Sequence, residues 1–132
     1  MVQTMSTRSL EALMKPLGSF PLLGERDSLK LALDLMTKHR LGISCFVDSE
    51  NQLIAVLSDG DLRRLLLSHQ SPLPALLVSD AIEFAQKNPT SISVSSDINH
   101  ARELMRTREV SDLPVISPTK GLIGLLHIHD ID

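Results

Sequence analysis

Residues 53–61 read LIAVLSDGD and residues 122–130 read LIGLLHIHD, so one pattern occurs twice, with a shift of 69 positions from Leu53 to Leu122. The same shift keeps the class of residue in phase along the whole stretch from Phe20 to Arg63. A pattern that stays in phase over this length indicates an internal duplication, and the duplication predicts the fold. The identical residues under the shift are Ala32 and Ala101, Leu35-Met36 and Leu104-Met105, Leu53-Ile54 and Leu122-Ile123, Leu57 and Leu126, and Asp61 and Asp130.

Each copy predicts the same order of elements: a helix, a hairpin of two strands and a second helix. Asp27 or Ser28 can cap the first helix, whose apolar residues recur at helical spacing, and the basic run 38–40 followed by Gly42 ends it. The polar run 48–51 is typical of a turn between two strands. The other predicted elements are strands at 43–47, 53–57, 113–116 and 122–126, and helices that begin near Ser58 and at Ser96 or Asp97.

The chain divides into segments by composition. The run Ser71-Pro72-Leu73-Pro74 is typical of a linker, and a short amphipathic segment follows at 79–85. The second copy stops where its last helix should run, so we expect that helix to be missing or its apolar surface to be covered by a partner. The predicted segments are a leader with a short helix at 1–17, a first repeat at 18–70, a linker at 71–78 and a second repeat at 79–132.

One repeat is too small to bury both faces of its hairpin and both of its helices alone. We therefore expect an α+β fold of two small sheets with flanking helices, packed sheet to sheet about a pseudo-twofold axis. That packing would create two related clefts, one at each repeat.

The composition excludes several classes of function. With 132 residues, 42% hydrophobic and 2% aromatic, the chain can form an aliphatic core. A net charge of −3 without a basic stripe or stacking aromatics argues against a nucleic-acid partner. The single Cys45 excludes an internal disulfide, and no apolar run reaches membrane-spanning length, so we expect a cytoplasmic protein without a membrane partner.

The segments AVLSDGD at 55–61 and GLLHIHD at 124–130, with Leu113-Pro114-Val115 on the strand before, resemble the tandem CBS domain. The first copy departs from the family pattern on its first hairpin strand, where Ser44-Cys45-Phe46 stands. The resemblance covers nearly the whole chain from Phe20 onward. It implies a regulatory pair that binds a nucleotide and forms a homodimer through its helix faces.

A narrower resemblance joins residues 58–64 (SDGDLRR) and 124–130 to the CBS tail of sugar-phosphate isomerases of the arabinose 5-phosphate isomerase type. The resemblance implies a separate sugar isomerase domain as partner, and an adenine nucleotide (AMP or ATP), CMP or CMP-Kdo as the ligand. The chain itself offers no position for the catalytic residues of that domain. A glycine-rich phosphate loop, a nucleophile elbow and paired zinc motifs are all missing from the sequence, so we expect no catalytic residue and no cofactor.

Ser58 and Asp61 lie where a strand ends and a helix begins, a place that favours an anionic group. The resemblance implies that Asp61 accepts hydrogen bonds from ribose hydroxyls and that Ser58 contacts phosphate. The alternative is structural, because Ser-x-x-Asp is also close to a capping box that satisfies the helix's own first turn. Arg63 or Arg64 could reach a phosphate from this helix, but not both, because adjacent helical residues point about 100° apart. The alternative for each is a solvated helix face.

His127 replaces the Ser or Thr of the motif in the second copy, and its charge responds to pH near neutrality. Asp130 keeps the ribose-binding role that the resemblance implies. The cluster with His129 also allows a metal site, but a divalent ion needs three or more converging ligands, so we expect none. Weaker ligand-binding candidates, at strand starts and on the first hairpin strands, are Phe20, Thr90, Ser44 and Pro114.

Three functions remain open at this point. The first is a regulatory module that senses a nucleotide or nucleotide sugar for an isomerase. The second is a purely structural module that only holds an oligomer together, which the departures at Ala55 and His127 would favour. The third is the regulatory part of a sugar nucleotidyltransferase.

Overall fold

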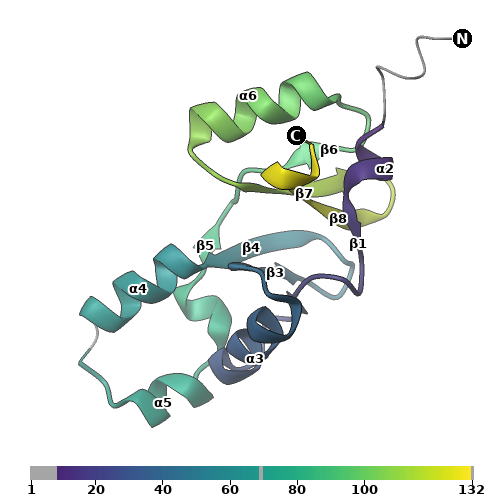
Figure 1. The fold of residues 1–132 in the computed structure, drawn as a ribbon. Helices are drawn as coiled ribbons and strands as arrows, with labels where there is room; N and C mark the ends of the chain where they lie inside the picture. The colour runs from purple at the N-terminus through teal and green to yellow at the C-terminus, as the bar shows by residue number, and fades with distance from the viewer. Residues whose placement is uncertain (1–8, 69, 132) are drawn as a thin grey trace, which may run out of the picture. The chain divides into compact units, whose positions relative to one another are not determined.

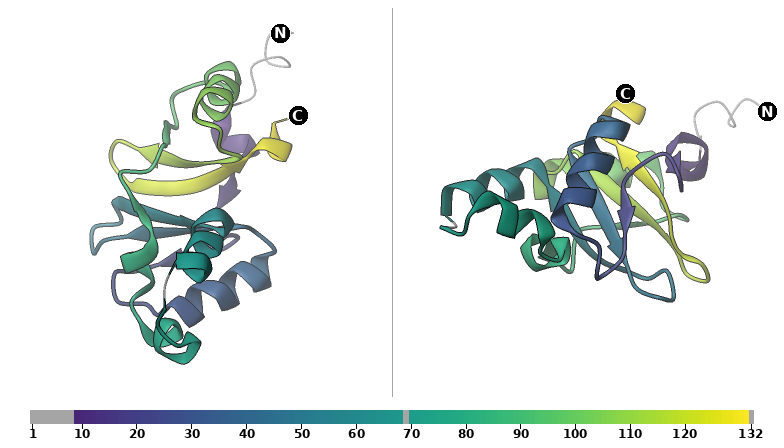
Figure 2. Two further views of the ribbon diagram at one scale, coloured as in Figure 1. Left: turned by 90° about the vertical axis from the view of Figure 1, so that its left-hand side faces the viewer. Right: turned by 90° about the horizontal axis from the view of Figure 1, so that it is seen from below.

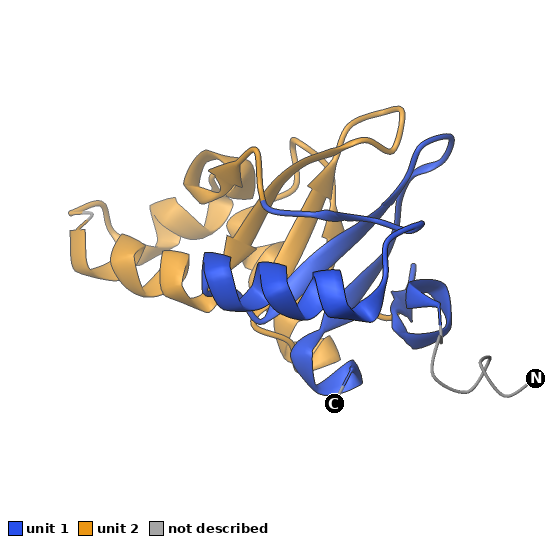
Figure 3. Ribbon diagram, turned by 90° about the horizontal axis from the view of Figure 1, so that it is seen from above, with its two compact units in different colours: residues 1–17, 90–132 blue, residues 18–89 orange. Residues whose placement is uncertain are grey.

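The computed structural model describes residues 9–68 and 70–131 of the chain. These form two compact units, one within residues 18–89 and one that joins residues 9–17 to residues 90–131 (Figure 3). Each unit contains one four-stranded sheet. The expected α+β fold of two small sheets with flanking helices is therefore confirmed, whereas the pseudo-twofold axis and the clefts between repeats stay predictions.

The unit of residues 18–89 is built on a sheet in the order β2-β3-β4-β5, of which Figure 1 labels β3, β4 and β5. Strand β2 pairs with β3 in parallel, and the other two pairings are antiparallel. The strands are β2 (Leu22–Leu23), β3 (Ile43–Val47), β4 (Leu53–Ser58) and β5 (Gln86–Lys87), and the helices are α3 (Leu29–His39), α4 (Asp59–Ser68), α5 (Leu73–Val78) and the 3₁₀ helix η1 (Ala81–Phe84).

Helix α3 begins where the sequence predicts, because the Ser28 hydroxyl accepts a hydrogen bond from the backbone N–H of Leu31 at 3.1 Å. Its end differs from the prediction. Arg40, not Gly42, takes the left-handed conformation that closes the helix, with a φ of 56°. Gly42 instead lies close to Asp59: a Cβ there would be 3.0 Å from the side-chain carbon of Asp59, so a larger residue would require that side chain to shift.

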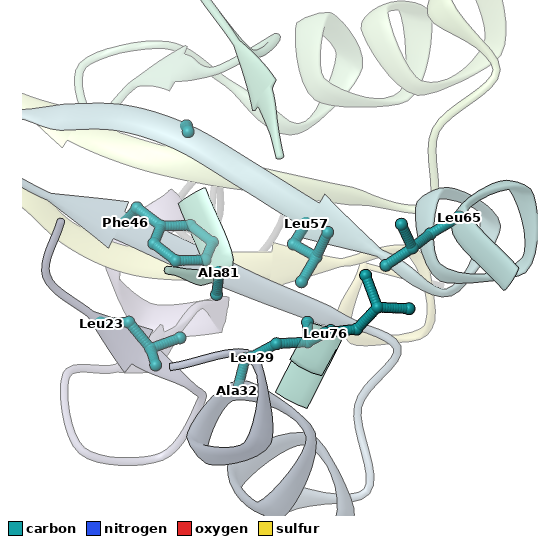
Figure 4. Packing of buried hydrophobic residues seen from close by; sticks show 9 residues of the cluster. Leu23, Leu29, Ala32, Phe46, Leu57, Leu65, Leu76 and Ala81 are labelled. Carbon is teal, nitrogen blue, oxygen red and sulfur yellow. The ribbon is translucent and has the colours of Figure 1, made fainter. Parts of the chain in front are cut away.

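The helices of this unit cover one face of the sheet, as Figure 2 shows from two further directions. Phe46 from β3 and Leu57 from β4 point into this layer, where Leu76 from α5 meets them (Figure 4). The buried cluster consists of Leu23, Leu29, Ala32, Phe46, Ala55, Leu57, Leu65, Leu76 and Ala81. Because α5 contributes to the core, the segment 71–78, which composition predicts as a linker, is also a packing element.

The second unit has a sheet in the order β1-β8-β7-β6. Its helix α6 (Ile98–Arg108) is capped by Asp97, whose carboxylate accepts from the backbone N–H of His100 at 2.8 Å. Its buried cluster consists of Leu10, Ile92, Ala101, Met105, Leu113, Val115, Leu126 and Ile131. The other elements are β1 (Lys15–Pro16), β6 (Ile92–Ser93), β7 (Asp112–Ser117), β8 (Gly121–His127), α2 (Leu10–Leu13) and the 3₁₀ helix η2 (Ile128–Asp130).

Each sheet takes an edge strand from outside the predicted repeat that supplies its hairpin. Strand β1, in the predicted leader, pairs antiparallel with β8, and β5, near the start of the predicted second repeat, pairs antiparallel with β4. Gly124 allows the first of these pairings, because a Cβ there would lie 2.9 Å from the backbone oxygen of Lys15. The division of the sequence into repeats at 18–70 and 79–132 stays a prediction, and the compact units follow a different division.

The predicted hairpins and first helices are confirmed within one or two residues, with strands at 43–47, 53–58, 112–117 and 121–127. The short helix predicted near the start of the chain is α2, capped by Ser9. Where the first copy continues into α4, the second continues into η2. Across the described residues, none of the helices has the length and apolar character needed to cross a membrane.

Candidate functional site

The first candidate site lies where β4 runs into α4, and Ser58 and Asp61 form it. The Ser58 backbone N–H and hydroxyl donate to Asp61 Oδ2 at 2.9 Å and 3.0 Å. The backbone N–H of Asp61 donates in return to Ser58 Oγ at 3.2 Å. This reciprocal arrangement is a capping box, so both side chains satisfy the first turn of α4.

The second carboxylate oxygen of Asp61 accepts two further hydrogen bonds. Arg64 Nη2 lies 2.6 Å from Oδ1 and Gln86 Nε2, from β5, lies 3.0 Å from it. The Asp61 side chain is only 7% exposed. Burial acts to raise its pKa, but the hydrogen bonds from the Ser58 backbone, Arg64, Gln86 and the Ser58 hydroxyl outweigh burial and hold the pKa below the usual value. Asp61 is therefore an ionised, buried carboxylate at neutral pH.

The second candidate site lies at the equivalent place, where β8 runs into η2. The His127 backbone N–H donates to Asp130 Oδ2 at 3.0 Å, just as the Ser58 backbone donates to Asp61. Lys15 Nζ, from β1, lies 3.3 Å from both oxygens of Asp130. Lys15 thus corresponds to Gln86 of the first site: each donates to the carboxylate of its site, and each comes from the exchanged edge strand.

His127 also contacts a carboxylate that the first site lacks. Asp112 and His127 face each other across the β7–β8 pair, and Asp112 Oδ1 lies 2.8 Å from His127 Nδ1. The corresponding pair of the other hairpin is Ile43 and Ser58. Burial raises the pKa of Asp112 above its usual value, although His127 and Lys15 act to lower it. The second site therefore replaces an apolar and a hydroxyl side chain by an acid and a base.

The structure brings together the predicted pairs Ser58 with Asp61 and His127 with Asp130. The predicted Arg63 is exposed, and the arginine that contacts Asp61 is its neighbour Arg64. The sequence analysis missed three residues of the two sites. These are Lys15, Gln86 and Asp112.

The weaker candidates lie in different surroundings. Phe20 and Pro114 are buried, and Thr90 is half-buried. Ser44 is fully buried on β3, and its hydroxyl has no hydrogen-bond partner among the described residues. It lies opposite Leu57, on the face of β3 that also carries Phe46, so this hydroxyl borders the helix-covered core.

An open groove of about 500 Å³ lies between α3 and α4, and Asp59 and Leu62, which line it, are neighbours in sequence of Ser58 and Asp61. Its lining combines apolar side chains with the polar groups of Thr37, Arg40 and Asp59. The lining residues are Leu33, Met36, Thr37, Arg40, Leu41, Gly42, Asp59 and Leu62. In the part of the chain that the structure describes, no group of three or more His, Cys, Asp or Glu side chains converges to hold a metal ion.

Comparison with known sequences gives one family. The model of the CBS domain matches residues 10–68 and 78–132. An uncharacterized protein of Rickettsia prowazekii is 30% identical over 122 residues, which are 92% of this chain and 36% of that protein. The arabinose 5-phosphate isomerase KdsD of Francisella tularensis is 25% identical over 122 residues, 36% of its length. The chain thus spans about a third of the length of these relatives.

Comparison with solved structures gives the same fold. The CBS domain protein of Pyrobaculum aerophilum, complexed with AMP, matches with a TM-score of 0.78 at 21% identity. The match covers 93% of this chain and 89% of that one.

Proposed function

Because this chain belongs to the CBS domain family, we propose that it is a regulatory module that binds an adenine nucleotide through the sites around Asp61 and Asp130. One observation carries the proposal: both repeats hold a carboxylate at the same point after a hairpin, fixed by the backbone N–H three residues earlier. Further support comes from the Pyrobaculum aerophilum protein of the same fold, which is complexed with AMP.

The contacts of Asp61 suggest how a nucleotide would be held. An ionised carboxylate accepts strong hydrogen bonds, and ribose offers two adjacent hydroxyl donors. Arg64 and Gln86 already occupy Oδ1, so ribose would replace one or both of these donors. A released Arg64 guanidinium could then pair with phosphate. Ligand binding regulates only if it favours one arrangement of the module over another.

Calorimetry tests this proposal with AMP, ATP, CMP and CMP-Kdo as titrants. We expect saturable heat with at least one adenine nucleotide, and a loss of affinity of roughly tenfold or more in Asp61→Asn or Asp130→Asn. Asp34→Asn is the matched control, because Asp34 only forms an exposed pair with Lys30. The absence of heat with all four ligands would overturn the proposal.

We further propose that the parent protein is a cytoplasmic sugar-phosphate isomerase, for which this chain supplies regulation and not catalysis. The support is the similarity to KdsD of Francisella tularensis, a longer protein of which this chain matches 36%. The regulatory part of a sugar nucleotidyltransferase is the alternative parent. Isomerisation of arabinose 5-phosphate by this chain alone would contradict a purely regulatory role.

A structural role is the second candidate function, and the filled acceptors of Asp61 favour it, because this site satisfies itself without a ligand. A homodimer through the helix faces is the arrangement that we propose. Large apolar side chains on α4 and α5 are available for it, with Leu67 81% and Val78 77% exposed. Sedimentation of the wild type and of Leu67→Glu separates the outcomes: a dimer that dissociates on substitution supports this role, and a monomeric wild type excludes it.

A further inference from the structure

The two sites differ in their ionisable groups, although their backbones correspond. Where the first site has Ile43 and Ser58, the second has Asp112 and His127. Where the first has the neutral amide of Gln86 from the exchanged strand, the second has the ammonium group of Lys15. The second site therefore holds a group whose charge changes near neutral pH, and the first does not.

The charges that face His127 come from three elements. Asp112 lies on β7, Lys15 on β1, and Asp130 and His129 on η2. The ring of His129 is 5.0 Å from that of His127, edge to face. With His127 neutral, two carboxylates outnumber one ammonium group, and the site carries one net negative charge. Protonation of His127 brings the four groups Lys15, Asp112, His127 and Asp130 to neutrality.

We propose that the second repeat's site selects a phosphate-bearing ligand by taking up a proton on His127, with Asp112 as the residue that positions the imidazole. This inference rests on the proposed function and adds a form of regulation to it. Phosphate is repelled by the net negative site and accepted by the protonated one. The first site, where Asp61 and Arg64 balance each other, has no such dependence.

The geometry gives Asp112 its role. Its carboxylate engages Nδ1, so the other ring nitrogen, Nε2, is the one that can donate to a ligand. His127 is 25% exposed and Asp112 only 15%, so the imidazole is accessible while its partner is largely covered. The protonated ring carries a hydrogen on both nitrogens, so Nε2 is then a donor while Nδ1 stays with Asp112.

The experiment compares AMP with adenosine by calorimetry at about pH 6 and about pH 8. For the wild type we expect AMP affinity to fall about fivefold or more between the two pH values, with proton uptake visible as a dependence on buffer ionisation enthalpy. Adenosine affinity should not change. The phosphate of AMP itself titrates in this range, so the decisive comparison is His127→Ser, which restores the residue of the first repeat and should lose most of the dependence.

Two further variants sharpen the test. His129→Gln removes the neighbouring imidazole and keeps the contact with Asp112, so it should retain the wild-type dependence. Asp112→Asn should weaken AMP binding at about pH 6 and leave adenosine binding unchanged, because the imidazole loses the carboxylate that positions it. An equal pH dependence of AMP binding in the wild type and His127→Ser would overturn the inference, as would an equal dependence for adenosine.

Inorganic phosphate separates this inference from the proposed function. At about pH 6 it should shift the ring resonances of His127 in an NMR titration, and it should do so weakly at about pH 8. Heat with AMP but no pH dependence would leave the proposed function standing and overturn the inference. A phosphate response at His127 with no heat from any nucleotide would support the inference about His127 and overturn the proposed nucleotide binding.

Discussion

At the scale of single residues, Asp61 is a buried, charged side chain, and both of its carboxylate oxygens accept hydrogen bonds. It accepts from the Ser58 backbone and hydroxyl, from Arg64 and from Gln86. We expect Asp61→Ala to lower the free energy of unfolding by about 1–3 kcal/mol, because these donors lose their acceptor. Urea denaturation measures the change. Asp34→Ala, which removes an exposed pair with Lys30, should change stability by about 0.5 kcal/mol or less, and equal effects would contradict the assignment.

Asp61 and Asp112, whose pKa values are shifted in opposite directions, should change the stability of the protein in opposite directions as pH rises. Asp61 has a lowered pKa, so its contribution is present above the usual value of 3.8 and is lost as pH falls through the lower folded-state value. The gap in stability between wild type and Asp61→Asn should therefore narrow in acid. Asp112 has a raised pKa, so its contribution is present below 3.8 and is lost as pH rises through the folded-state value. Urea denaturation across this range should show Asp112→Asn gaining relative to wild type as pH rises.

Ser44 offers a substitution that should stabilise the protein. Its side chain is fully buried, and among the described residues its hydroxyl has no hydrogen-bond partner. Ser44→Ala should raise the free energy of unfolding by about 1 kcal/mol, because the cost of the unpaired hydroxyl disappears. The exposed Ser49 in the hairpin turn provides the control, and Ser49→Ala should be nearly neutral. A loss of stability in Ser44→Ala would mean that the hydroxyl is satisfied.

At the scale of elements, the pairing of β1 with β8 depends on Gly124. A Cβ at this position would lie 2.8 Å from Met14 Cγ and 2.9 Å from the Lys15 oxygen, and backbone cannot move aside cheaply. Gly124→Ala should therefore cost about 1–3 kcal/mol of stability and weaken hydrogen-exchange protection along β1. Gly60→Ala is the control, since its Cβ would meet only side-chain atoms at 3.5 Å or more. A neutral Gly124→Ala would mean that β1 can shift without cost.

The sequence predicts the elements that carry a regular pattern over several residues. Helix caps at Ser28 and Asp97 and both hairpins follow from local chemistry and period alone. The two-residue strands β1, β2, β5 and β6 are too short to carry a period, and their pairing depends on residues far along the chain. The sequence analysis did not predict helix α5, because Pro72 and Pro74 at its start are typical of a linker.

The sequence likewise predicts only those residues of the candidate sites that lie close together along the chain. Ser58, Asp61, His127 and Asp130 are visible because each pair sits within one motif. Asp112 becomes visible only when the β7–β8 register places it opposite His127. Lys15 and Gln86 come from the exchanged strands, so a repeat considered by itself does not contain them.

At the scale of the whole molecule, the compact unit of the second repeat needs the first residues of the chain. Leu10 is fully buried in the cluster that also contains Leu113 and Leu126. Leu10→Ala should cost about 2–5 kcal/mol, and hydrogen exchange should locate the loss in β7 and β8. Leu76→Ala is the counterpart and should act on β3 and β4. Loss of protection by Leu10→Ala in β3 and β4 alone would contradict this division.

The exchanged edge strands also set the order in which the sheets can be completed during translation. All strands of the β2–β5 sheet have been synthesised once Lys87 has left the ribosome. Strand β1 is made earlier than any of them, but its partner β8 emerges only with residues 121–127. Among the strands that the structure describes, β1 is thus synthesised first and paired among the last, and until then its edge is open to a neighbouring nascent chain.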